Sequence, residues 1–166
     1  MNRISERANA DITKTDLKKL LSIAREDINL FFSRYPKYAE YEGKERLIAL
    51  GQGAALHYID KKNGVKDFDV WFFYPQFKIV LPYRRRGVID YGPSKFGKHP
   101  NDGKFAGRRV DILIRSDSHF DRGVPWVSLQ KYLRDGRTKT ARKLAEKAMV
   151  GLYPEKFFGE ILWYNK

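Results

Sequence analysis

Cysteine is absent from the 166 residues of the chain, which excludes disulfides, thiolate metal sites, cysteine nucleophiles and thiol redox chemistry. No stretch approaches the roughly 18 consecutive apolar residues of a membrane span, and residues 1–16 lack the apolar run of a signal peptide. Acidic side chains are also few, 20 against 33 Lys and Arg, which leaves a net charge of +13. We therefore expect a soluble, cytoplasmic protein with no membrane partner, whose surplus charge favours polyanions.

The length and composition predict one compact domain over residues 1–166. Hydrophobic residues make up 42% of the chain and aromatic residues 14%, which argues against disorder even though many positions are charged. No repeat, low-complexity tract or linker divides the chain. We expect a core at about 46–116, an N-terminal helix over 15–34 and C-terminal helices over 126–150.

The N-terminal helix is predicted from apolar residues at helical spacing, between a candidate N-cap at Thr13 or Thr15 and a stop before Pro36. These apolar residues are Leu17, Leu20, Leu21, Ala24, Ile28, Phe31 and Phe32. The C-terminal helices are predicted in the same way, and the last of them is expected to continue to about Val150.

Strands are predicted where apolar, aromatic and β-branched residues form short runs. The clearest runs are 46–50, 68–74 and 108–114, with shorter strand-like pieces at 77–81 and 87–91 in a segment rich in proline and glycine. The first run ends in Gly51-Gln52-Gly53, and a short helix follows from Ala54. The expected fold class is α+β, a small mixed sheet with helices packed on it.

Three aspartates mark two of these strands. Because side chains alternate along a strand, Asp67 and Asp69 point to one face while the apolar residues between and after them point to the other. Asp111 interrupts the strand at 108–114 in the same manner. Neighbouring strands of this kind bring three carboxylates together, and such a cluster is costly without a cation. Mg²⁺ suits it, being a hard ion held by carboxylates, waters and substrate phosphates. Each aspartate alone is equally compatible with an ordinary strand-edge position.

The glycine turn supplies the complementary chemistry. A strand that runs through Gly51-Gln52-Gly53 into a helix offers backbone N–H groups and a partial positive charge to a phosphate. A G-x-G sequence alone is also what a tight strand-to-helix turn requires. Its place 14 to 16 residues before Asp67 and Asp69 favours a shared site.

The order of these parts resembles the nucleotidyltransferase fold of the DNA polymerase β superfamily, and most of all its minimal members, the nucleotidyltransferase toxins of abortive-infection and toxin–antitoxin systems. The resemblance covers about residues 46–116. It implies that Gly51 and its neighbours Gln52 and Gly53 bind the nucleotide, ATP or another NTP, at its triphosphate. Lys66 is a further candidate nucleotide-binding residue, which either contacts a phosphate or neutralises the carboxylates. The resemblance also implies that Asp67, Asp69 and Asp111 are the catalytic residues and ligate two Mg²⁺ ions, with Asp111 helping to activate the acceptor hydroxyl. Gln52 stands where the family usually has Gly or Ser, and Lys66 where Ser or Thr is frequent.

Basic residues concentrate between the acidic strands, where residues 78–109 carry 9 basic and 2 acidic side chains. Tyr83, Tyr91 and Phe96 interleave with them, a combination that suits stacking on single-stranded or loop RNA. A solvated charged face is the competing interpretation. His57, His99 and His119 lack metal-ligand spacing and are expected to be structural or surface groups. The candidate nucleic-acid-binding residues are Arg84, Arg85, Arg86, Lys95, Lys98, Arg108, Arg109, Lys139, Arg142 and Lys143.

Three functions follow from these patterns. The first is Mg²⁺-dependent transfer of a nucleoside monophosphate from an NTP to a hydroxyl. RNA or a tRNA end is the expected acceptor, with a small molecule or a protein as the alternatives, and an antitoxin protein is a further expected partner. The second is a catalytically inactive module of the same fold that binds RNA or protein, motivated by Gln52. The third and weakest is a metal-dependent nuclease, since clustered carboxylates with Mg²⁺ also serve phosphodiester hydrolysis.

Overall fold

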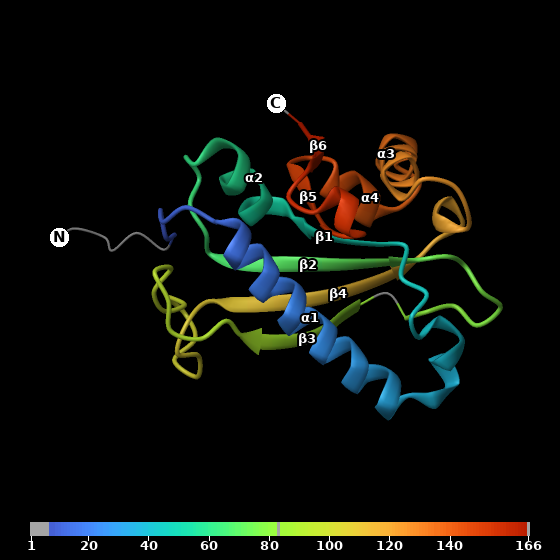
Figure 1. Cartoon of the computed structure of the whole chain (residues 1–166), viewed down its shortest axis with the longest axis horizontal. Helices are drawn as coiled ribbons and strands as arrows, with labels where there is room; N and C mark the ends of the chain where they lie inside the picture. Colours follow the sequence, from blue (N-terminus) through green and yellow to red (C-terminus); the bar gives the residue numbers. More distant parts are fainter. Residues whose placement is uncertain (1–6, 83, 166) are drawn as a thin grey trace.

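The computed structural model of the chain describes residues 7–82 and 84–165, and for residues 84–87 it describes the backbone only. Its elements are labelled in Figure 1. The helices are α1 (Lys14–Arg34), α2 (Gln52–Asp60), α3 (Pro125–Asp135) and α4 (Lys139–Leu144), with 3-10 turns η1 (Pro36–Tyr41), η2 (Ser118–Phe120) and η3 (Glu155–Phe157). The strands are β1 (Leu47–Gly51), β2 (Asp67–Tyr74), β3 (Arg84–Asp90), β4 (Arg109–Ser116), β5 (Ala148–Tyr153) and β6 (Ile161–Tyr164).

All six strands belong to one sheet in the order β3-β4-β2-β1-β5-β6. The β2–β4 pair is parallel and the other four pairs are antiparallel. This mixed sheet with helices packed on it confirms the predicted α+β fold class. Because β5 pairs with β1, the C-terminal strands extend the sheet beyond the expected core of 46–116.

Helix α1 forms where the sequence predicts it. Thr13 caps it, accepting a hydrogen bond from the Asp16 amide while the Asp16 carboxylate accepts one from the Thr13 amide. This capping box satisfies two amides that would otherwise lack partners at the helix N-terminus. The buried stripe of α1 crosses one face of the sheet, which we call the α1 face (Figure 1).

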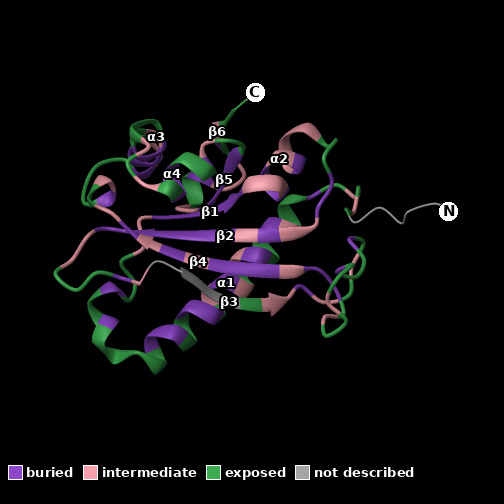
Figure 2. Cartoon of the chain, turned by 180° about the vertical axis from the view of Figure 1, so that it is seen from behind, coloured by how far each residue is buried: buried purple, intermediate pink, exposed green. Residues whose placement is uncertain are grey.

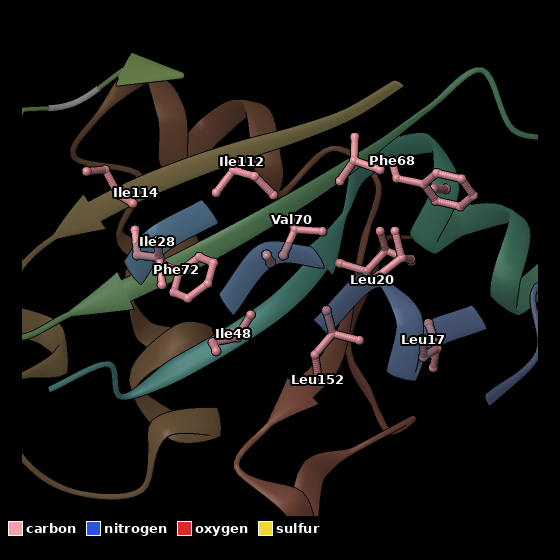
Figure 3. Packing of buried hydrophobic residues seen from close by; sticks show 14 of the residues in the cluster. Leu17, Leu20, Ile28, Ile48, Phe68, Val70, Phe72, Ile112, Ile114 and Leu152 are labelled. Carbon is pink, nitrogen blue, oxygen red and sulfur yellow. The ribbon is translucent and has the colours of Figure 1, made fainter. Parts of the chain in front are cut away.

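The α1 face carries the larger of two hydrophobic clusters. Leu17 and Leu20 of α1 pack there with Phe68, Val70 and Phe72 of β2 (Figure 3). Figure 2 shows buried residues running along β2 and β4. The alternate residues of β2, among them Trp71 and Phe73, belong to the second cluster with α3 and α4. We call this opposite side the α4 face.

The C-terminal helix prediction is wrong beyond residue 144. Helix α4 ends at Leu144, and Ala148 to Tyr153 form β5 instead of continuing the helix to Val150. The apolar residues 141, 144, 145 and 148 fit helical spacing, but pairing with β1 buries residues 148–152 completely on both faces of a strand. Tertiary pairing therefore overrides the local pattern.

The two short strand-like pieces predicted at 77–81 and 87–91 have different outcomes. Residues 77–81 form no strand; the Tyr41 hydroxyl instead donates to the Ile79 carbonyl and accepts from the Phe77 amide. Residues 87–90 do lie in a strand, β3, which begins three residues earlier than the expected piece.

Candidate active site

The glycine turn and two of the aspartates lie in one row across the sheet. Met149 of β5, Gly51 of β1, Asp69 of β2 and Asp111 of β4 are successive register partners. Gly51 is the N-cap of α2, which begins at Gln52. A Cβ at Gly51 would lie 3.0 Å from the Met149 sulfur, so the row leaves little space for any side chain at that position.

All three aspartates lie on the α4 face. Asp67 and Asp69 alternate with Phe68 and Val70, which pack in the α1-face cluster, and Asp111 lies between Val110 and Ile112 of that same cluster. Asp69 and Asp111 are directly opposite each other on parallel strands. The backbone thus places three carboxylates together beside the glycine turn, as the strand periodicity predicts.

Arg109 lies among these carboxylates. Its Nη2 is 3.4 Å from Asp67 Oδ2 and 3.4 Å from Asp111 Oδ2, and its Nε is 3.3 Å from Asp111 Oδ1. Asp111 is only 2% exposed, and a buried carboxylate requires compensation of this kind. The prediction that Arg109 lies on a nucleic-acid surface is not met, because its guanidinium lies inside the acidic cluster.

His99 contacts the other side of Asp67. Its Nε2 lies 2.8 Å from Asp67 Oδ1, and its Nδ1 accepts a hydrogen bond from the Asn101 amide. The two ring nitrogens of His99 thus have different neighbours, the Asn101 amide at Nδ1 and the Asp67 carboxylate at Nε2. His99 is buried, and its contact with a candidate catalytic residue is one that the sequence spacing does not predict.

Two small cavities border Asp67 and Asp69, and Asp111 lines neither of them. The first, of about 170 Å³, is lined by Arg7, Gln52, Gly53, Ala54, Lys66, Asp67, Asp69 and Lys147. The second, of about 180 Å³, is lined by Gln52, Asp69, Trp71, Leu113, Thr140, Lys143 and Leu144. Each is smaller than the roughly 300 Å³ at which typical ligand sites begin, and Gln52 and Asp69 line both.

The first cavity combines cations with a helix N-terminus. Three basic side chains line it, and the backbone of Gln52 and Gly53 begins α2 there. Gln52 has a φ of +56°, a left-handed conformation that is uncommon for residues other than glycine and often occurs at functional sites. Glycine, which has no Cβ, adopts this conformation without steric cost, so it would suit this position.

Sequence reasoning missed Arg7 and Lys147 as members of this cavity. Arg7 reaches it because Ala8 and Val65 form an isolated bridge, with amide-to-carbonyl distances of 2.8 and 2.7 Å. Lys147 directly precedes β5, a segment for which the sequence pattern predicts a helix. Neither position carries a local signal, since both depend on pairings between distant segments.

The residues expected to bind nucleic acid are dispersed. Arg108 is buried and donates from Nε to the Phe96 carbonyl; burial lowers the pKa of its guanidinium, and nearby Asp67 opposes that shift. Lys95 lies 2.8 Å from Asp16 of α1. Lys98, Lys139, Arg142 and Lys143 are exposed. The side chains of Arg84, Arg85 and Arg86 lie outside the described residues.

The expected stacking rings are also placed differently. Tyr91 and Phe96 are 3% and 1% exposed and pack on Phe68 in the core. The Tyr91 hydroxyl donates to Asp16 Oδ1 at 2.8 Å, and burial together with that carboxylate raises the pKa of Tyr91. These two rings are therefore not available to stack on RNA, and Tyr83 lies outside the described residues.

The residue type of the three aspartates agrees with Mg²⁺, which prefers hard carboxylate oxygens, and the three come from neighbouring strands on one face. In the described part of the chain, however, no group of three or more His, Asp or Glu side chains is arranged to hold a metal ion. The described contacts of Asp67 and Asp111 are with Arg109 and His99 instead.

Comparisons of the chain with protein-family models, with curated proteins and with solved structures find no match. The family resemblance drawn from the motifs therefore stays a prediction. Among the residues that the structure describes, none of the helices has the length and apolar character needed to cross a bilayer.

Proposed function

We propose that this chain is a Mg²⁺-dependent nucleotidyltransferase that moves a nucleoside monophosphate from an NTP to a hydroxyl group. The observation that carries the proposal is the register row in which Asp69 lies between Gly51 and Asp111. It puts a candidate phosphate-binding turn and a carboxylate cluster side by side, as the reaction requires.

The first cavity is the proposed site of the triphosphate. Arg7, Lys66 and Lys147 supply positive charge, and the α2 amides at Gln52 and Gly53 add hydrogen-bond donors. The second cavity, which also has Asp69 in its lining, is the proposed site of another part of the NTP or of the acceptor. Trp71, Leu113 and Leu144 provide its apolar lining.

In the proposed reaction the acceptor oxygen forms a bond to the α-phosphorus while the bond from that phosphorus to the β-phosphate oxygen breaks. Pyrophosphate leaves, and the hydroxyl proton passes to a carboxylate of the cluster, for which Asp111 is the family-based assignment. Asp67, Asp69 and Asp111 would hold Mg²⁺, which when bound lowers the cost of charge at the transferring phosphate.

The acceptor is proposed to be RNA, such as a tRNA end, because the net charge of +13 favours a polyanion and Lys139, Arg142 and Lys143 are exposed on α4 beside the second cavity. A cytoplasmic location belongs to the same proposal. The antitoxin partner stays a prediction that no described contact tests.

The test is a transfer assay with α-labelled NTPs, Mg²⁺ and total RNA. Wild type is expected to label RNA, and Asp69→Asn to lose at least about 100-fold of the rate because it removes one ligand charge. Asp11→Asn is the matched control, since Asp11 is exposed and outside both cavities. Equal rates for the two variants would contradict the assignment of Asp69.

A second candidate is the inactive binding module of the same fold, and the ion pairs of Arg109 with Asp67 and Asp111 favour it. This alternative predicts that no NTP is incorporated by wild type and that the Asp67→Ala/Asp69→Ala variant binds RNA as tightly as wild type. Shortening of the RNA in the same assay would instead indicate the nuclease.

A further inference from the structure

The acidic cluster already contains a cation that belongs to the chain. Asp69 and Asp111 face each other across parallel strands, and Asp67 lies two residues along the same face. Like charges at this spacing repel, and ionised carboxylates that are largely buried destabilise a fold unless a positive group accompanies them. Arg109 supplies that group with one guanidinium that reaches both Asp67 and Asp111.

The contacts of Arg109 are long for charge-assisted hydrogen bonds. Such bonds are usually about 2.7–2.9 Å between nitrogen and oxygen, whereas those of Arg109 measure 3.3–3.4 Å. The Arg109 side chain is also 25% exposed, in contrast to 3% for the Asp111 side chain. The guanidinium therefore balances the negative charge of the carboxylates through long contacts, and it borders solvent. Its side chain can move away from the carboxylates without disturbing the packing of the hydrophobic core.

His99 distinguishes the two oxygens of Asp67. It lies against Oδ1 and is itself fixed by its backbone amide, which donates to the Gly107 carbonyl, and by the Asn101 amide on Nδ1. Arg109 lies against Oδ2. Withdrawal of Arg109 would thus remove its positive charge from Asp67 Oδ2 and from the Asp111 carboxylate, while the contact of His99 with Asp67 Oδ1 remains.

We propose that Arg109 is an internal counter-ion that competes with the divalent cation for the carboxylates of Asp67 and Asp111. In the metal-free state Arg109 holds the cluster together, and binding of the metal displaces it. This inference rests on the proposed function for the identity of the ligand site, but it concerns metal affinity and not transfer.

The proposal is tested by titrating the protein with Mn²⁺ and measuring free Mn²⁺ by electron paramagnetic resonance. Arg109→Gln removes the competing charge, and we expect it to bind Mn²⁺ at least about fivefold more tightly than wild type. Arg115→Gln is the matched control, because Arg115 lies on the same face of the same strand, opposite Phe73, roughly 20 Å along β4. It lowers the net charge equally and is expected to leave the Mn²⁺ affinity within twofold of wild type.

A second variant guards against loss of folding in Arg109→Gln. Arg109→Lys keeps the charge but carries a single ammonium that cannot bridge two carboxylates as a guanidinium does, so its Mn²⁺ affinity is expected between those of wild type and Arg109→Gln. Urea unfolding provides a further readout: Arg109→Gln is expected to lose stability without metal and to regain more of it than wild type when Mn²⁺ is added.

Unchanged or weaker Mn²⁺ binding in both Arg109 variants would overturn the proposal, and so would equal tightening in Arg115→Gln. Failure of the proposed function is a separate result, because RNA labelling can be absent while Arg109→Gln still tightens Mn²⁺ binding. Conversely, wild type could label RNA while the Arg109 variants bind Mn²⁺ with the same affinity as wild type. That result would support the proposed transferase activity and contradict the counter-ion role of Arg109.

Discussion

Gln52 occupies a backbone conformation that glycine adopts more easily. A left-handed φ destabilises the folded state by about 1–2 kcal/mol when an L-residue adopts it. Glycine avoids this strain, but its greater conformational freedom in the unfolded chain destabilises the fold by about 0.5–1 kcal/mol. With a φ of +56° at Gln52, Gln52→Gly is expected to stabilise the fold by about 0.5 kcal/mol in urea unfolding. Because the Gln52 side chain lines both cavities while its proposed contact with phosphate is made by the backbone amide, removing that side chain is expected to raise NTP transfer in the same variant.

Lys61→Gly is the matched control for this prediction. Lys61 has a φ of +59° at the C-cap of α2 and lines neither cavity. It is expected to gain similar stability with no change in transfer. If Lys61→Gly and Gln52→Gly alter transfer to the same extent, the Gln52 side chain has no part in the site.

His119 makes stability depend on pH. Burial opposes its charge, but hydrogen bonds with Asp135, at 2.7 Å from Nε2, and with Asp117 outweigh burial and raise the pKa of His119. A group whose pKa is raised in the folded state stabilises fully below its unfolded pKa of about 6.5 and loses that contribution as the pH rises through the folded pKa.

The stability advantage of wild type over His119→Gln is therefore expected to be larger at pH 6 than at pH 9, as measured by urea unfolding at both pH values. His57→Gln is an unsuitable comparison because His57 bonds to the backbone at Ala10 and Gly64. An advantage that grows from pH 6 to pH 9 would contradict the assignment of the two carboxylates to His119.

The position of a residue could be predicted from the sequence where it depends on the periodicity of its own strand or helix. Asp67, Asp69 and Asp111 are on one face because strands alternate, and Gly51 precedes a helix because the turn and the apolar pattern change there. Arg7 and His99 could not be predicted, since the first depends on the Ala8–Val65 bridge and the second on the course of residues 91–108.

Among the helices and strands, β5 differs most from its prediction, because the sequence pattern there predicts a helix. Its apolar residues continue the spacing of α4, so only its pairing with β1 distinguishes strand from helix. The same pairing brings Met149 beside Gly51 and Lys147 to the first cavity. The helix α1 and the strands β2 and β4 were predictable because each has a long, regular pattern and, for α1, a capping box.

Gly151→Ala tests the placement of β5. A Cβ at Gly151 would lie 2.2 Å from the Phe157 carbonyl oxygen, which is backbone and cannot move aside as a side chain can. Such overpacking is expected to cost about 3 kcal/mol in urea unfolding. Were residues 148–150 part of a helix that ends near Gly151, this clash would not exist.

Gly103→Ala is its control, since a Cβ there meets no atom within 4 Å. We expect a change within about 0.5 kcal/mol of wild type. A loss as large for Gly103→Ala as for Gly151→Ala would contradict the steric explanation.

At the scale of the whole molecule, the charge of +13 is distributed over surfaces with different roles. Arg108 and Arg109 are held by internal contacts, and Lys95 pairs with Asp16, so these three are committed to the fold or the acidic cluster. Lys139 and Lys143 are exposed on the α4 face. Composition indicates a polyanion partner, but only the tertiary structure separates the cations that can reach one.

Binding of single-stranded RNA is expected to weaken as salt rises. If Lys139 and Lys143 neutralise phosphates, Lys139→Ala/Lys143→Ala should reduce the slope of log K against log salt by roughly 1.4, about 0.7 for each lysine replaced. The control is Lys18→Ala/Lys37→Ala, which removes equal charge from α1 and η1 on the opposite side of the sheet. Equal slopes for the two double variants would contradict an RNA surface on α4.

The central claim is that the row of Gly51, Asp69 and Asp111 serves nucleotidyl transfer. It is tested most directly by incubating the protein, Mg²⁺ and RNA with an NTP labelled at either the α- or the γ-phosphate. Transfer of a nucleoside monophosphate predicts that only the α-label enters RNA and that the γ-label leaves in pyrophosphate, with both signals lost in Asp69→Asn. Entry of the γ-label, or no entry of either label with any of the four NTPs, would contradict the claim.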